Sequence, residues 1–168
     1  MIFLQGHGVS PAYSAKIYKH YGKDSIAVVK ENPYRLARDM YGISFITADK
    51  IAQHIGIDPN SLIRAKAGLI YVLNQLTDEG HTHYPQTELT QKAREILKVD
   101  KKVIRMAIAE LSREKKVFLE SLDTERSDDV AVYLASLFVA EKKISDELKR
   151  LKESPSKIRP IHPEKAIE

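Results

Sequence analysis

A signature of six identical residues occurs twice in this chain, and its two copies lie 34 residues apart. Each copy reads Gly-apolar-Ser, then Lys-Ile, then His-x-Gly; the first runs from Gly8 to Gly22 and the second from Gly42 to Gly56. A repeat of this period indicates one supersecondary unit that is used more than once. We predict that each unit is a tight turn followed by a helix, and that the closing glycine ends the helix.

The turn that opens each unit is predicted to hold an anion. Glycine permits a φ that other residues resist, the apolar residue is available for a shared core, and the serine hydroxyl stands beside the backbone N–H groups. Such N–H groups, with a helix N-terminus behind them, favour an anion, for which nucleic-acid phosphate is the simplest candidate. The predicted DNA-binding residues are Gly8, Val9, Ser10, Lys16, Gly42, Ile43, Ser44 and Lys50. Contacts of this kind position a protein on the backbone but read no sequence.

Composition narrows the functional classes. The net charge of +4 permits nucleic-acid binding without requiring it. The absence of cysteine excludes disulfides and thiolate catalysis and suits a reducing compartment. Because no apolar run approaches the ~20 residues of a membrane span and no signal peptide is evident, we expect a cytoplasmic protein with no membrane partner.

Catalytic and metal-binding signatures are missing from the sequence. The chain has no G-x-x-x-x-G-K-[ST] phosphate loop, no H-E-x-x-H and no G-x-S-x-G. His81 and His83 have no cysteine or acidic companion that would complete a metal site. We therefore predict no catalytic residues, no metal and no cofactor within this chain.

The hydrophobic pattern predicts a mainly α chain. Helices are expected at about 11–21, 24–31, from Asn32-Pro33 through Leu36, 47–55, 61–79, 87–97, 101–114 and 135–153. The segment 81–85 is expected to be a loop. Asp100 is expected to be the N-cap of the helix at 101–114. Residues 117–119 and 130–134 read as a two-stranded β-hairpin. Three helices followed by a hairpin is the order of a winged helix.

The helix predicted at 101–114 offers a possible second DNA surface. Four basic residues lie on or just before its first turns: Lys98, Lys101, Lys102 and Arg105. Glu110 and Glu114 reduce the net positive charge of this helix. The alternative to DNA binding is therefore a module that packs against protein and whose charged face is only solvated. The sequence leaves both interpretations open.

The two repeats resemble helix–hairpin–helix motifs, which bind DNA without sequence preference. The wider stretch resembles the N-terminal region of stand-alone RecD-like DNA helicases, which are also described as exodeoxyribonuclease V alpha-subunit homologues. The residues that carry this resemblance are Ile17–Lys19, Glu31–Ala37, Gly42–Phe45 and Thr47–Ala52.

The resemblance implies a fold, a domain order and partners. In that family, a helix–hairpin–helix region and a winged-helix-like region precede two RecA-like motor domains, which use ATP and magnesium to move 5′ to 3′ along single-stranded DNA in repair and recombination. We therefore expect a tandem helix–hairpin–helix domain at 1–57, a winged-helix-like unit with a β-hairpin and a C-terminal helix at 58–153, and a linker at 154–168. Expected partners are single-stranded or forked DNA and the parent's motor domains, which this chain lacks and which would carry ATP and magnesium.

Departures from the family pattern keep alternatives open. Serine stands at positions 10 and 44, where the hairpin usually has a second glycine, and Ala12 and Ile46 stand where a basic residue is common. These losses and the modest net charge favour a runner-up, a structural module that docks on the motor or a repair partner without touching DNA. An independent nuclease or glycosylase is a third class, but Asp49 after the second motif lacks the pocket that such an acid needs.

Overall fold

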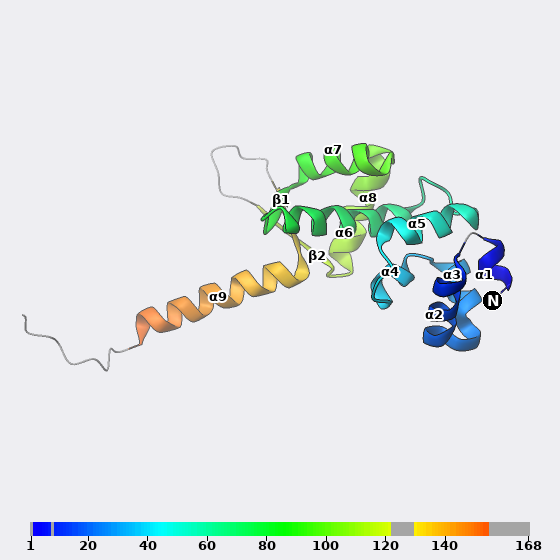
Figure 1. Cartoon of the computed structure of the whole chain (residues 1–168). Coiled ribbons are helices and arrows are strands. Elements are labelled where there is room, and N and C mark those ends of the chain that lie inside the picture. Colours follow the sequence, from blue (N-terminus) through cyan, green and yellow to red (C-terminus); the bar gives the residue numbers. More distant parts are fainter. Residues whose placement is uncertain (1, 8, 122–129, 155–168) are drawn as a thin grey trace, which may run out of the picture.

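The computed structural model describes residues 2–7, 9–121 and 130–154 and is mainly helical (Figure 1). The first part of the chain forms α1 (Ile2–Gly6), α2 (Pro11–Tyr21), a 3-10 turn (Gly22–Asp24), α3 (Ser25–Glu31), α4 (Arg35–Asp39) and α5 (Phe45–His54). The second part forms α6 (Leu62–Asp78), β1 (His83–Pro85), α7 (Gln86–Leu97), α8 (Lys101–Arg113), β2 (Val117–Ser121), β3 (Val130–Leu134) and α9 (Ala135–Glu153). The predicted mainly α fold class is confirmed.

The repeated signature produces two helices that begin in the same way. The Oγ atoms of Ser10 and Ser44 accept the backbone N–H groups of Tyr13 and Thr47, each at 3.3 Å, and so cap α2 and α5. Gly56 follows the second helix with a φ of +85°, which glycine adopts without strain. The predicted turn–helix units are therefore present in both copies.

The two copies share one hydrophobic core. Val9 and Ile43, the apolar residues of the two turns, are each only 4% exposed. They pack in one cluster with the helix residues of both copies, which are Ile17 and Ile51, and with Leu4, Val29, Leu36 and Met40. Because each turn contributes to the core of both copies, neither copy buries its apolar residues alone.

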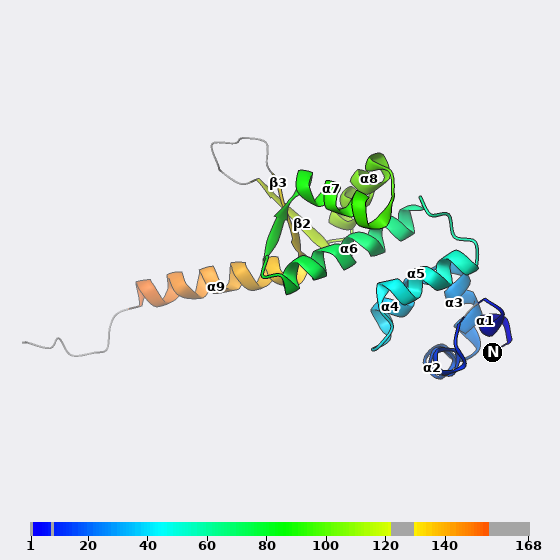
Figure 2. The ribbon, with the colours of Figure 1, turned by 45° about the horizontal axis from the view of Figure 1, so that its top comes forward.

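Helix α6 is central to the larger core. Figure 2 shows it between α5 on one side and α7 and α8 on the other. Its buried residues pack against Phe45 and Ala48 at the start of α5 and against the inner faces of α7, α8 and the sheet. The second copy is thus joined to the rest of the molecule through α5 and α6.

A buried ion pair also ties α5 to α6. Arg64 donates to both carboxylate oxygens of Asp49, at 2.8 and 3.0 Å, and to the carbonyl oxygens of Leu97 and Pro59, at 2.7 and 3.0 Å. The Tyr34 hydroxyl donates to the same carboxylate at 2.7 Å. Burial opposes ionisation of Asp49, but the hydrogen bonds from Arg64 and Tyr34 outweigh it and lower the pKa of this carboxyl.

The sheet has one strand more than the sequence predicted. Its order is β1-β3-β2, and both pairings are antiparallel. The hairpin of β2 and β3 was predicted, but β1 falls in the segment 81–85 that was expected to be a loop. Three residues are too few to show a period of two, and Pro85, which ends this edge strand, is itself a turn signal.

Two local expectations about helix starts need correction. Asp100 occupies the N-cap position of α8, but its side chain makes no capping hydrogen bond. Helix α4 begins at Arg35 rather than at the predicted Asn32-Pro33 start. The Asn32 side chain accepts the backbone N–H of Tyr34 at 3.1 Å, which closes a turn ahead of the helix.

Helix α9 projects from the body of the molecule (Figure 1). Near its start, Phe138 stacks on Phe118 of β2 with ring centroids 4.5 Å apart. Further along, Ile144, Leu148 and Leu151 are about 60% exposed. Most of the predicted linker, residues 155–168, lies outside the described residues, and the predicted domain limits at 57, 58 and 153 stay predictions. No described helix is both long and apolar enough to span a bilayer.

Gly68 provides a test of the packing between α6 and α7. A Cβ atom at this position would stand 2.5 Å from Cδ1 of Leu97, whose side chain is buried. Crowding of this kind costs about 1–3 kcal/mol, whereas alanine gains about 1 kcal/mol of helix propensity over glycine. We expect Gly68→Ala to lower the free energy of unfolding, as measured by urea denaturation. The same change in a Leu97→Ala background should instead raise it, and stabilisation in the wild-type background would contradict the close contact.

Candidate nucleic-acid interface

The second turn presents its backbone rather than its apolar side chain. Gly42 is exposed and has a φ of +87°, whereas the side chain of Ile43 points into the shared core. The Ile43 N–H donates to the Met40 carbonyl at 3.4 Å. Within the described residues, the N–H of Ser44 makes no hydrogen bond, and the first N–H groups of a helix have no intrahelical partner. Any anion at this turn would meet these N–H groups.

The first turn has a similar arrangement, as far as it is described. Gly8 lies outside the described residues. The N–H of Val9 donates to the Leu4 carbonyl at 3.1 Å, and its side chain is buried. The N–H of the exposed Ser10 makes no hydrogen bond to the part of the chain that the structure describes. Of the predicted contacts within the two turns, Val9 and Ile43 therefore serve the core, and the described exposed positions are Ser10, Gly42 and Ser44.

The structure pairs the lysine of the first copy with the turn of the second. The Nζ atom of Lys16 lies 3.9 Å from the place that a Cβ atom on Gly42 would occupy. The hydroxyl of Tyr13, also on α2, is 3.5 Å from the Gly42 carbonyl oxygen, to which it donates. From the sequence, Lys16 was expected to act with the turn of its own copy, Gly8–Ser10. Lys50, its counterpart on α5, is exposed.

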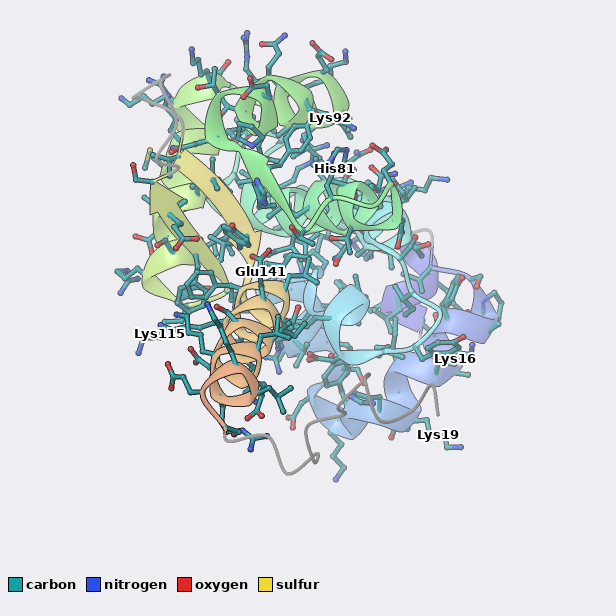
Figure 3. The ribbon with its side chains drawn as sticks, turned by 90° about the vertical axis from the view of Figure 1, so that its left-hand side faces the viewer. Lys16, Lys19, His81, Lys92, Lys115 and Glu141 are labelled. Carbon is teal, nitrogen blue, oxygen red and sulfur yellow. The ribbon has the colours of Figure 1, made fainter. Side chains whose placement is uncertain are left out.

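Tyr13 was missed as a candidate residue because the repeat gives no signal for it. The equivalent residue of the second copy is Thr47, so the position is not part of the shared signature. Lys16 and Lys19 both extend from α2 on the same edge of the molecule (Figure 3). The surface beside the second turn is therefore formed by residues of both copies, and its lysine side chains come from the first.

Asp39 of α4 is already paired with neighbouring side chains. Asp39 accepts hydrogen bonds from Arg38 at 2.7 Å and from the Tyr21 hydroxyl at 2.8 Å. The Arg38 contact, aided by Tyr21, holds the pKa of Asp39 at about 2. Burial, together with the hydrogen bond to this carboxylate, raises the pKa of Tyr21 to about 12. Asp39 therefore stays ionised and does not compete with phosphate as an unpaired acid would.

The predicted second surface is exposed, and its role stays a prediction. Lys98 ends α7 with a φ of +53°, and three further basic residues stand on the first turns of α8: Lys101, Lys102 and Arg105. The two acids expected to dilute this surface have partners elsewhere. Glu110 pairs with Arg113 at 2.7 Å, and Glu114 pairs with Lys66 and Lys116.

Acid sensitivity follows from Asp39 and Glu114. The hydrogen bond from Lys116, supported by Lys66, holds the pKa of Glu114 at about 2, like that of Asp39. Because these values are lower than those of an unfolded chain, the stability that the two groups add is complete above about pH 4.5 and is lost as the pH falls towards 2. Melting temperatures across this range should fall less steeply for an Asp39→Asn/Glu114→Gln variant than for the wild type. Equal slopes would contradict the ion pairs.

The histidines show no metal site. The ring of His81 packs edge-on against Tyr84, and that of His83 lies 4.9 Å from the Tyr133 ring. Among the described residues, no group of three or more potential ligands stands together. His54, in the repeat, bonds through Nδ1 to the Lys50 carbonyl at 2.8 Å, which is a contact within its own helix.

Two turn–helix units that share one core define a helix–hairpin–helix domain. Comparison with known proteins agrees with this assignment, because residues 1–83 match the family described as "ATP-dependent RecD2 DNA helicase HHH domain". Residues 1–83 are therefore similar to the HHH domain of ATP-dependent RecD2 DNA helicases. This range extends through α6 and includes His83 of β1.

The similarity continues beyond that domain. In an alignment of 158 positions that covers 90% of this chain, the sequence is 27% identical to the ATP-dependent RecD2 DNA helicase of Deinococcus radiodurans. The chain spans 22% of the length of that relative. The resemblance to the N-terminal region of RecD-like helicases, inferred from the sequence, is confirmed.

Proposed function

We propose that this chain is the DNA-binding accessory region of an ATP-dependent DNA helicase and that it holds the DNA backbone without reading sequence. In this proposal the parent helicase moves 5′ to 3′ and acts in repair or recombination, and ATP and magnesium belong to its motor domains. The substrate is single-stranded or forked DNA.

The observation that carries the proposal is the second turn. Exposed backbone at Gly42 and Ser44 stands beside the ammonium group of Lys16, and a helix N-terminus lies behind it. Open N–H groups, a fixed cation and a helix dipole are the three features that attract a phosphate. The side chain of Ile43 is buried, so it does not reach a base edge from the turn. Backbone contact is therefore the chemistry that this turn favours.

A docking role is the second candidate function, and α9 favours it. Ile144, Leu148 and Leu151 recur at helical spacing and are about 60% exposed. Apolar residues in such a row are typical of a surface that another protein covers. In this alternative, α9 packs on the motor domains or on a repair partner, and the hairpins do not contact DNA.

Salt-dependent binding separates the two candidates. Fluorescence anisotropy of labelled forked DNA should show an affinity that falls steeply between low and moderate salt, with a log–log slope of about −3 for three to four neutralised phosphates. A Lys16→Gln/Lys50→Gln variant should bind more weakly and show a smaller slope, whereas a Lys142→Gln/Lys143→Gln variant on α9 provides a control with the same change in charge. No binding at low salt, or an affinity that does not change with salt, would overturn the proposal.

A further inference from the structure

A groove between the helix–hairpin–helix domain and the sheet lies apart from the hairpin surface. Its volume is about 820 Å³, in the upper part of the ~300–1,000 Å³ range of small-molecule sites. Its walls come from α4, the first residue of α5, one face of α6, the end of α8 and the start of α9. Lys115, on its wall, lies at the opposite edge of Figure 3 from Lys16 and Lys19.

We propose that this groove binds a single-stranded segment of nucleic acid, with an unpaired base stacked on Tyr71 and phosphates held by the surrounding basic side chains. The inference rests on the proposed DNA-binding function and assigns the single-stranded part of the substrate to a surface of its own. None of the residues that line this groove was predicted from the sequence to bind DNA.

The charge of the groove is strongly one-sided. Five basic residues line it, namely Arg35, Arg38, Lys66, Lys115 and Lys116, whereas Glu114 is the acidic residue among those lining it. Asp39, which pairs with Arg38 at 2.7 Å, offsets part of this charge, and the basic residues still outnumber the two acids. A groove lined by one sign of charge concentrates ligands of the opposite sign, and a polyanion is the ligand that suits it.

Several of these cations remain available to a ligand. Lys66 and Lys116 both share the carboxylate of Glu114, so one negative charge faces two ammonium groups. Lys115 is exposed and has no ion pair within the described part of the chain. The Nε atom of Arg35 is buried and makes no hydrogen bond to the described residues, while Asp39 lies 3.6 Å away.

Aromatic rings favour a nucleic acid over an acidic peptide. Tyr34, Phe45 and Tyr71 line the groove as a continuous stack, with centroid distances of 5.7 and 5.0 Å. Tyr34 and Phe45 are buried, so the half-buried Tyr71 is the ring at the accessible end. Cationic grooves with aromatic platforms hold single strands, because every base has a π-face that stacks without sequence preference. A base in a duplex is already stacked, so the ligand must be single-stranded.

Amide side chains in the groove can both donate and accept hydrogen bonds, whereas a carboxylate ligand would use only their donors. Asn32 and Asn74 also line the groove. An amide both donates and accepts hydrogen bonds, as base edges do, whereas a carboxylate only accepts. The lining as a whole therefore fits unpaired nucleotides better than an acidic segment of protein.

The geometry of Lys115 permits a test with little risk to the fold. Lys115 has a φ of +56° after the end of α8. Glycine is the residue that such a position favours, so Lys115→Gly should leave the melting temperature unchanged or higher. Lys115→Gly removes one charge from the groove, and Lys142→Gln on α9 is the control that removes one charge outside it. Tyr71→Ala and Tyr71→Phe separate the aromatic ring from the hydroxyl group.

The experiment measures two DNA forms in parallel. Anisotropy of a labelled oligothymidylate of ~12 nucleotides reports the single-stranded site, and a labelled duplex reports the hairpins. We expect Lys115→Gly to weaken oligothymidylate binding about threefold and Tyr71→Ala to weaken it about tenfold. Tyr71→Phe and Lys142→Gln should keep wild-type affinity, and duplex binding should change in none of the four variants.

Two outcomes would overturn the inference while the proposed function stands. One is duplex binding by the wild type together with oligothymidylate binding that Tyr71→Ala and Lys115→Gly leave unchanged. The other is competition by poly-glutamate as strong as that by unlabelled oligothymidylate, which would assign the groove to an acidic partner protein. Failure of the wild type to bind any DNA form would instead remove the proposed function, and the inference with it.

Discussion

Replacing Arg64 by alanine is expected to lower the free energy of unfolding by about 3–5 kcal/mol. The guanidinium is buried and donates to Asp49 and to two backbone carbonyls. Its removal leaves a buried, ionised carboxylate and the carbonyl of Leu97 without these donors. Chemical denaturation followed by circular dichroism measures the loss, and a loss below about 1 kcal/mol, typical of exposed pairs, would contradict a structural role.

Two further variants identify the cause of that loss. Arg113, which is 76% exposed and pairs with Glu110, is the matched control, and Arg113→Ala should leave the free energy of unfolding nearly unchanged. The double variant Asp49→Leu/Arg64→Met removes both charges together. It should be more stable than Arg64→Ala, because most of the expected loss comes from leaving one charge buried without its partner. A double variant as unstable as the single one would point to lost packing instead.

The second large effect is expected at the turn of the second copy. Gly42→Asp should weaken binding of forked DNA at least about tenfold. The new Cβ would stand 3.9 Å from Nζ of Lys16, so the carboxylate would neutralise that cation and place a negative charge where a phosphate is proposed to bind. Anisotropy titration at low salt measures the change.

Gly56 provides a matched control for this variant. Its φ of +85° is close to the +87° of Gly42, and nothing stands within 4 Å of a Cβ atom placed there. Both aspartate variants should therefore lose about 1–2 kcal/mol of stability from backbone strain. Only the change at position 42 should weaken DNA binding. Equal loss of affinity in both variants would show that strain, and not the charge at the turn, is responsible.

Local signals in the sequence were enough to predict most of the elements. Helix α2 begins at Pro11 after its serine cap and ends before Gly22, as expected, and the limits of β3 and α9 also agree with the prediction. Capping residues, prolines and glycines fix such boundaries within a few positions of the chain. The shared core of the two copies was predictable for the same reason, because Val9 and Ile43 occupy equivalent places in the repeat.

Contacts between distant residues were not predictable in this way. Arg64 and Asp49 are 15 positions apart, and the contact of Tyr13 with Gly42 spans 29. The three-residue strand β1 exists because β3 lies beside it, and the groove exists because α4 and α8 face α6. In a single sequence such features leave no periodic pattern, since they depend on how finished elements pack together.

The position of Lys16 beside Gly42 has a consequence for how this domain can be divided. A duplicated motif suggests two interchangeable modules, each able to be transplanted or deleted alone. Here the ammonium group beside the second turn belongs to Lys16 of the first repeat. Deleting the first repeat would therefore remove this cation from the second turn, and deleting the second repeat would remove the turn beside which Lys16 lies. The smallest transferable unit is therefore the pair of repeats.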